Sequence, residues 1–492
     1  MDFYQLNLAI FVATNGYLLY RQYSSSGGNG RKESIDISLA GSDDLETAEK
    51  GPDASAARRF QLNFFLPYAL AVAADWLQGP HIYAIYKYEK NLPEKTVAAL
   101  YAAGFVSGGI SASFAGGLAD RFGRKRACLL YCGLYIITCL TMLSDSLLVL
   151  FFGRLTGGVS TTLLFSVFEA WMISTYHEQG LHTSGLELGT VFGNMTTLSC
   201  VVAIASGVFG DVLVTYSGTR TWPFMAAGMC CVGAAYMISR IWNENYGARS
   251  TEQTSLQDLK GGLSVILGDA KILSLGITSC FFEGTMYLFI FFWSAALKSA
   301  RAQSGSTDED LPYGLIFSSF MCAMMTGSAI FTLQTSAKTV QSTAGTLMTV
   351  TLVVASCLSL AAMLQDERLL FWALCLLEGC IGAYFPSMAQ LKSELIEDGI
   401  RGRVYSILRF PLNVLVVVAH SLDVEGKQAF APAGPTFPPY TTWKGGGDNT
   451  PINLCCVTDN KRTGDAHRNH VFLTCASLLL VAFLVSRRYL AQ

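Results

Sequence analysis

The sequence predicts an all-α membrane protein made of two six-helix bundles and one extra hydrophobic helix at the amino terminus. Of its 492 residues, 51% are hydrophobic and only 14% are charged, whereas soluble proteins carry about 25% charged residues. Its long apolar stretches lack the alternation of polar and apolar residues that a membrane β-barrel requires. With a net charge of −2, the chain offers no basic surface for nucleic acid.

Apolar stretches of roughly 20 residues are long enough to cross the hydrocarbon core of a bilayer as helices. Thirteen such stretches are predicted, over residues 2–20, 61–88, 97–119, 126–144, 147–174, 188–210, 222–242, 271–298, 312–333, 343–364, 369–391, 403–420 and 470–490. Lys and Arg are more frequent in the loops on the side of residues 22–57 than in the short loops opposite. This bias places the amino terminus outside.

Polar stretches divide the chain. Residues rich in Ser, Gly, Pro and charge bury too little apolar surface to offset the entropy of an ordered chain. The predicted segments are a membrane anchor helix at 1–21, a disordered cytosolic linker at 22–59, an N-terminal six-helix bundle at 60–242, a cytosolic central loop at 243–270, and a C-terminal six-helix bundle at 271–492 with a long disordered outer loop at 421–469.

A charged motif follows the stretch 97–119, in a predicted inner loop where glycine permits a tight turn and basic residues hold the inner face. Its defined positions are Gly116, Asp120, Arg121, Gly123, Arg124 and Lys125. The pattern resembles the signature of the major facilitator superfamily, which lies between the second and third helices of the first half. The resemblance implies the major facilitator fold and makes this loop a gating motif.

Ionisable residues inside apolar stretches are costly in lipid and by default mark a substrate or ion pathway. They are Asp75, Arg154, Glu169, Glu283, Glu378 and Arg409. Neighbouring polar or aromatic candidates are Trp76, Gln78, Asn194, Tyr287, Tyr384 and Asn413. The resemblance implies that the two six-helix halves are related by a two-fold repeat, which would make Asp75 equivalent to Glu283 and Arg154 equivalent to Glu378. We therefore expect one central site near the bilayer midplane. As an alternative, some of these charges form structural ion pairs, Glu169 first among them.

Several strings narrow the resemblance to one branch. They are ADWLQGP at 74–80, FSVFEAW at 165–171, IFSSFM at 316–321, YFPSM at 384–388 and RFPL at 409–412. These strings are similar to those of the molybdate-anion transporter branch of the superfamily. The resemblance covers most of residues 60–420 and implies uptake of molybdate by alternating access.

The charge of the embedded residues bears on such a substrate. Two arginines and four carboxylates sum to −2, and a bound dianion would make the sum −4. Burial disfavours the charged form of a carboxyl group. We therefore expect Asp75 or Glu283 to bind a proton when the oxyanion binds, with Arg154 and Arg409 as donors to the anion. As an alternative, each arginine pairs with a glutamate, and the polar and aromatic candidates bind the substrate.

Other functions stay open at this point. They are transport of sulfate, another organic anion or a sugar, and a transceptor or scaffold role without transport. The sequence contains no nucleophile elbow, phosphate loop, HExxH motif or zinc-type cysteine spacing, so we expect no enzyme activity, no cofactor and no metal site. We expect a monomer in the plasma membrane, or else in an endomembrane, whose partners are molybdate, protons and the lipid bilayer, without nucleic acid.

Overall fold

The computed structural model describes residues 2–38, 52–112, 114–181, 186, 188–247, 263–303, 311–334, 340–396, 404, 407–408, 411–412, 415 and 454–490. Across these residues the regular structure is helical, without strands. Eight of the described helices are long and apolar enough to cross a membrane, and one bent pair could form a ninth span. The protein is therefore an all-α, multi-pass membrane protein. The count of thirteen spans stays a prediction, because stretch 403–420 falls largely outside the described residues.

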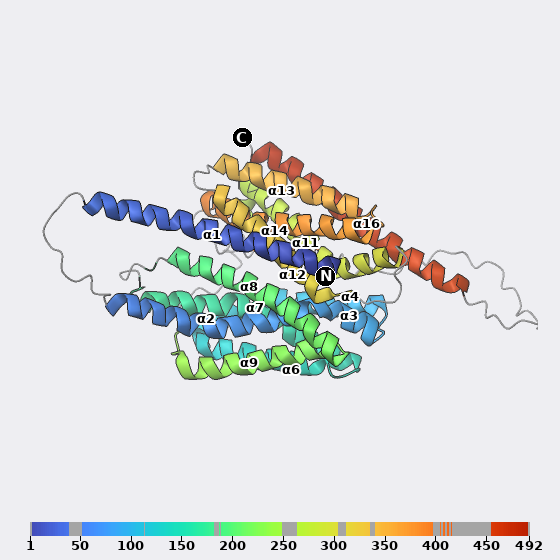
Figure 1. Ribbon diagram of the computed structural model, residues 1–492, viewed down its shortest axis with the longest axis horizontal. Helices are drawn as coiled ribbons and strands as arrows, with labels where there is room; N and C mark the ends of the chain where they lie inside the picture. Colours follow the sequence, from blue (N-terminus) through green and yellow to red (C-terminus); the bar gives the residue numbers. More distant parts are fainter. Residues whose placement is uncertain are drawn as a thin grey trace, which may run out of the picture.

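The N-terminal bundle forms the lower layer in Figure 1. Its helices are α2 (Pro52–Gln78), α4 (Glu94–Ala112), α5 (Ala115–Phe122), α6 (Arg124–Thr141), α7 (Leu147–Glu178), α8 (Leu188–Ser217) and α9 (Thr221–Ile241). Short pieces η1 (Gly79–His81), α3 (Ile82–Ala84) and η2 (Ile85–Glu89) continue α2. The break begins at Gly79-Pro80, because proline has no N–H for the helical ladder. The predicted span 97–119 is likewise two helices, α4 and α5, bent by 52°.

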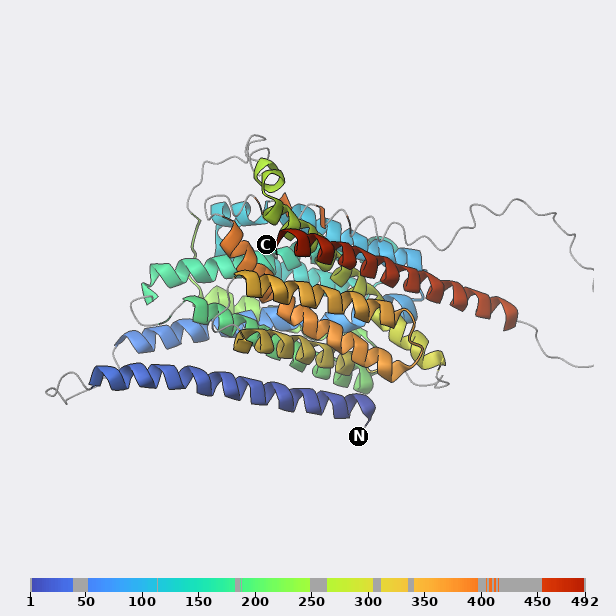
Figure 2. The same cartoon turned by 90° about the horizontal axis from the view of Figure 1, so that it is seen from above.

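The C-terminal bundle forms the upper layer (Figure 1). It contains α11 (Ala270–Gln303), α12 (Tyr313–Gln334), α13 (Val340–Ala361), α14 (Glu367–Leu395) and α16 (Leu454–Tyr489). Helix α14 packs against α11, α12 and α13, and α16 packs against α11 and α13. The amino-terminal part of α16 runs out beyond the other helices in both views (Figures 1 and 2).

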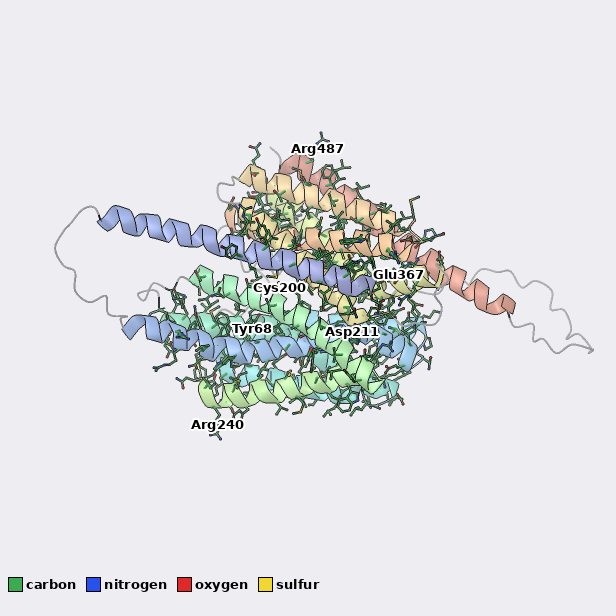
Figure 3. All side chains as sticks on the ribbon, viewed as in Figure 1. Tyr68, Cys200, Asp211, Arg240, Glu367 and Arg487 are labelled. Atoms are coloured by element: carbon green, nitrogen blue, oxygen red, sulfur yellow. The ribbon has the colours of Figure 1, made fainter. Side chains whose placement is uncertain are left out.

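Helix α1 (Phe3–Ser38) belongs by contact to the C-terminal bundle, although the chain leads from it into the N-terminal bundle. It lies along one side of the molecule (Figure 2). Its buried Asn15 donates from Nδ2 to the carbonyl of Cys322 on α12 at 2.9 Å. At its start, the Tyr4 hydroxyl donates to Glu367 of α14 (Figure 3), which also pairs with Arg301 of α11 at 3.4 Å.

Three predicted boundaries differ from the structure. The anchor helix continues to Ser38 instead of ending at residue 21, and α2 begins at Pro52, so helix occupies much of the predicted disordered linker 22–59. Helix α16 begins at Leu454, inside the predicted disordered loop 421–469. The composition rule failed because polar residues that build no core can still extend a helix that apolar residues have nucleated.

The two bundles meet closely at the end of the molecule that carries the amino terminus, which the charge bias predicts to be outside. The backbones of helices α8 and α12 approach each other closely there, since a Cβ on Gly314 would overlap the carbonyl oxygen of Gly207. Asp211 of α8 (Figure 3) accepts from the backbone N–H groups of Gly314 and Leu315 at 2.8 and 3.0 Å. The carboxylate thereby caps the start of α12 across the bundle boundary.

Aromatic contacts join the bundles deeper along their length. Phe105 of α4 lies 4.9 Å from Tyr287 of α11, between ring centroids. Tyr101, one turn away on α4, meets Phe291 edge-to-face at 5.0 Å. These two contacts join α4 of the N-terminal bundle to α11 of the C-terminal bundle.

Candidate functional site

The N-terminal polar cluster is centred on Asp75 of α2. Its Oδ1 accepts a hydrogen bond from the Tyr135 hydroxyl of α6 at 3.0 Å, and the Gln78 amide donates to the same hydroxyl. The helical spacing of Asp75 and Gln78 thus does bring them to a shared partner. Trp76 points to another neighbour: its Nε1 donates to Ser199 of α8 at 3.3 Å, and its ring lies 5.7 Å from that of Phe317 in the other bundle.

Arg154 is a cation of α7 inside this cluster. Its Nε donates to the carbonyl of Leu100 on α4 at 3.2 Å, and its guanidinium carbon lies 5.3 Å from the centre of the Tyr101 ring. Gly104 makes room for it, since a Cβ there would lie 2.7 Å from one terminal nitrogen. Arg154 acts electrostatically on Asp75. However, no carboxylate among the described residues lies within 4.0 Å of it, so its charge lacks a direct ion-pair partner there.

The C-terminal cluster is centred on Glu283 of α11. The Ser279 hydroxyl donates to Glu283 Oε1 at 2.6 Å, and the hydroxyl of the buried Tyr384 on α14 donates to the same oxygen at 3.1 Å. Lys392 of α14 places Nζ 4.0 Å from that oxygen and donates to Ser279 Oγ at 3.1 Å. Phe282 stacks on Tyr384 with centroids 3.8 Å apart and so fixes the tyrosine ring.

The two clusters have a common plan. In each bundle a tyrosine from a neighbouring helix donates to a carboxylate, in the pairs Asp75–Tyr135 and Glu283–Tyr384. Glu283 and Tyr287 lie one turn apart on α11, and Tyr287 contacts the N-terminal bundle. The face of α11 that carries Glu283 is therefore turned toward the other bundle, as a site between the bundles requires.

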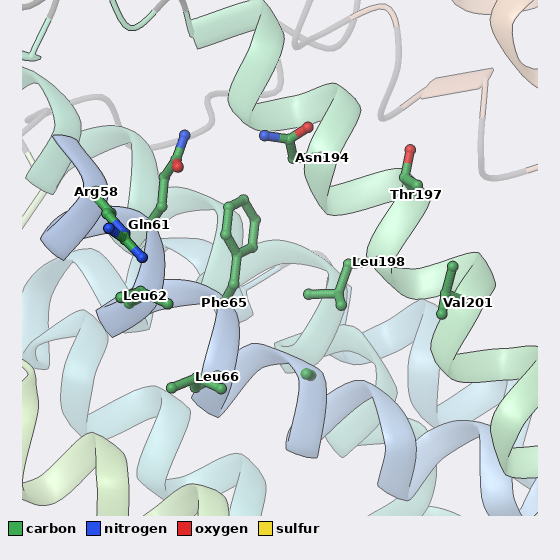
Figure 4. A pocket seen from close by; sticks show the side chains of 10 residues that line it. Arg58, Gln61, Leu62, Phe65, Leu66, Asn194, Thr197, Leu198 and Val201 are labelled. Carbon is green, nitrogen blue, oxygen red and sulfur yellow. The ribbon is translucent and has the colours of Figure 1, made fainter. Parts of the chain in front are cut away.

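The remaining predicted residues lie elsewhere. Glu378 of α14 is buried at 6% exposure, with no hydrogen bond or ion pair to the described residues. Glu169 is half-buried near Tyr68, and the structural ion pair expected for it is absent from the described part of the chain. Asn194 is exposed and lines a groove of about 540 Å³ between α2 and α8 with Arg58 and Gln61 (Figure 4). Arg409 and Asn413 lie outside the described residues.

The charged motif for which the resemblance predicts a gating role is clamped within its own bundle. Asp120 pairs with Arg124 at 2.7 Å, while Arg121 is exposed. Glu244, which the sequence analysis missed, accepts from the backbone N–H of Lys125 at 2.8 Å. Gly123 has φ +110°, and a Cβ there would lie 2.5 Å from the Glu244 carboxyl carbon. The sequence gives no signal of this contact, because Lys125 and Glu244 are 119 positions apart.

Replacing Gly123 by Ala is expected to destabilise the protein by about 2 kcal/mol, because a side chain at this positive φ is strained and displaces Glu244. The melting temperature of the purified protein measures this effect. The matched control is Gly116→Ala in the same motif, where a Cβ meets nothing within 4 Å. Equal melting temperatures for the two variants would show that the clamp is unimportant.

Comparisons with known proteins agree with this geometry. A family model described as sugar transporters, 12 TM, matches residues 40–367. The molybdate-anion transporter of Xenopus laevis is 34% identical over 383 residues, which cover 75% of this chain and 81% of that protein. The chain belongs to the major facilitator superfamily, in the molybdate-anion transporter branch. The branch member of Takifugu rubripes is 32% identical over 419 residues, covering 78% of this chain and 84% of that protein.

A solved structure supports the fold of this major facilitator protein. The D-xylose-proton symporter aligns with a TM-score of 0.62 over 88% of this chain and 98% of that one, at 11% identity. At such low identity the likeness concerns the fold alone. Membership in the superfamily confirms the predicted fold class and makes the protein a membrane transporter rather than an enzyme.

Proposed function

We propose that this protein carries molybdate across the membrane by alternating access. The observation that supports the proposal most strongly is Arg154, a guanidinium within a membrane-crossing helix that has no carboxylate within 4.0 Å among the described residues. A charge in such a place is costly unless it is paired or used. The planar fork of arginine suits the oxygens of a tetrahedral dianion, and the relatives in this branch are named for molybdate.

A sugar is the main competing substrate, because the matching family model is described by sugar transport. Two features favour an anion. The relatives named for molybdate match more of the chain than the family model does. In addition, each polar cluster contains a cation, Arg154 in one and Lys392 in the other. Sulfate has the same charge and shape as molybdate, and the names of the relatives are what favours molybdate in this proposal.

Uptake of radiolabelled molybdate in cells that lack their own carrier tests the proposal. We expect uptake that saturates and that excess unlabelled molybdate blocks. Excess sulfate should compete weakly, and a sugar should not compete. Uptake equal to that of cells with an empty vector would contradict the proposal, and would favour the transceptor or scaffold role if the protein still changes signalling.

We further propose that protons accompany the anion, with Asp75 or Glu283 as the acceptor. The two cations Arg154 and Lys392 balance the two negative charges of one dianion. Ionised carboxyl groups beside the anion would then leave an excess of negative charge in a poorly solvated site, so a neutral carboxyl group is favoured. Influx should therefore rise as the external pH falls. Asp75→Asn, which removes one acceptor but keeps its shape, should change that dependence. Influx that is constant between about pH 5 and pH 8 would contradict coupling.

We also propose that one chain in the plasma membrane forms the working unit. Both polar clusters lie within a single chain, which supports a monomer. Imaging of a tagged protein tests the location, with an endomembrane as the competing outcome. The mass of the protein in a native-like bilayer disc tests the oligomeric state.

A further inference from the structure

The cluster around Glu283 has the form of an oxyanion cradle that is occupied by a carboxylate of the chain itself. Two hydroxyls donate to one atom, Glu283 Oε1: that of Ser279 at 2.6 Å and that of Tyr384 at 3.1 Å. The Lys392 ammonium lies 4.0 Å from the same oxygen and donates to Ser279 Oγ at 3.1 Å. Two hydroxyls and a cation around one negatively charged oxygen are also what an oxygen of a tetrahedral oxyanion requires.

We propose that Lys392, with the hydroxyls of Ser279 and Tyr384, binds the transported oxyanion, and that Glu283 fills this cradle when the anion is absent. The inference rests on the proposed transport of an oxyanion and adds a binding residue that the sequence analysis did not select. Sequence reasoning overlooked Lys392 because a lysine near the inner end of a membrane helix usually anchors the helix at the interface.

The ion pair is suited to exchange. The side chains of Lys392 and Glu283 are 18% and 20% exposed, so the pair is not sealed in a dry core. The distance of 4.0 Å is longer than that of a charge-assisted hydrogen bond, which is about 2.7–2.9 Å. An ammonium group on a flexible stem turns readily between acceptors. Lys392 can therefore leave Glu283 for a more strongly charged ligand.

The position of the cradle fits a substrate path. Ser279, Glu283 and Tyr287 follow one another at intervals of four residues and share one face of α11. Tyr287 on this face contacts Phe105 of the N-terminal bundle. The cradle thus lies on the surface where the two bundles face each other, toward the predicted inner end from the aromatic contacts.

Exchange has a consequence for the neighbouring charge. Once an anion takes Lys392, the carboxylate of Glu283 lies beside a dianion, and the repulsion between them opposes binding. Among the described residues, Lys392 is the cation that lies within 4.0 Å of Glu283. Removing the negative charge of Glu283 should therefore raise the affinity for the oxyanion.

Calorimetric titration of the purified full-length protein with molybdate tests the inference. Lys392→Gln should weaken binding roughly ten- to hundredfold, the usual effect of losing one charge-assisted hydrogen bond. Lys392→Arg should retain most of the affinity, and Lys271→Gln, an exposed lysine of the same predicted side, should bind like the parent. Glu283→Gln, which removes the charge that repels the anion, should raise the affinity, a result that a merely structural role would not give.

The outcomes separate this inference from the proposed function. If the parent protein binds sulfate or phosphate but not molybdate, and Lys392→Gln abolishes that binding, the cradle stands and the choice of molybdate falls. If Lys392→Gln, folded by its melting temperature, binds molybdate as Lys271→Gln does, the cradle is wrong and the transport function stands. The absence of binding by any of the three oxyanions to the parent overturns the inference.

Discussion

Arg154→Leu is expected to lower molybdate uptake at least about a hundredfold. The change removes a guanidinium that would make two charge-assisted hydrogen bonds to the anion, each contributing about 1.5–3 kcal/mol. It also leaves Asp75 without its nearby cation. Initial uptake rates, normalised to the amount of protein at the cell surface, measure the effect.

Two controls make this result specific to the site. Arg154→Lys keeps the charge but loses the planar fork, so it should restore part of the uptake. Arg240→Leu changes an exposed arginine at the rim of the N-terminal bundle (Figure 3) and should leave uptake unchanged. If Arg154→Leu carried molybdate as well as Arg240→Leu does, the N-terminal cluster could not be the anion site.

Gly314→Leu is expected to abolish uptake without unfolding the protein. A side chain at Gly314 would overlap the backbone of Gly207 and lie 2.9 Å from the Asp211 carboxylate. These contacts join two bundles that must come together and separate in every transport cycle. The substitution therefore keeps the outer end from closing, while each bundle keeps its own core.

Two other glycine substitutions serve as controls for Gly314→Leu, one inside a single bundle and one at a position with free space. Gly327→Leu would force α12 away from the backbone of Gly379 on α14 within the C-terminal bundle, so we expect loss of folded protein. Gly345→Leu on α13 meets nothing within 4 Å and should change neither property. Melting temperature and uptake, measured together, distinguish these cases. Normal uptake by Gly314→Leu would show that the outer contact does not close during transport.

Sequence patterns predicted the parts of this architecture that depend on local periodicity. The apolar stretches that lie within the described residues are helices, and the spacing of Asp75 and Gln78 brings both to Tyr135. Arg154 and Glu283 were found because ionisable residues are conspicuous in apolar stretches. The helical extent of polar segments was missed, because composition reports the ability to build a core rather than the ability to extend a helix.

The residues that the sequence did not reveal act through partners from distant helices. Asp211 lies 103 positions from the backbone N–H of Gly314 that it caps, and Lys392 lies 113 positions from Ser279. Such pairings depend on how two helices cross, and the sequence pattern of one helix alone does not predict the crossing. Glu169 and Asn194 show another limit of composition, since polar residues in predicted spans can be half-buried or line a groove without contacting either cluster.

The most direct test is transport by the purified protein in liposomes, where no other carrier or partner is present. With molybdate outside and none within, the parent protein and Lys271→Gln should accumulate radiolabelled molybdate to saturation. Arg154→Leu should show little uptake, and Lys392→Gln should need roughly ten to a hundred times more molybdate for the same uptake. Accumulation by the parent no greater than in protein-free liposomes, under an imposed pH gradient of either direction, would contradict the account.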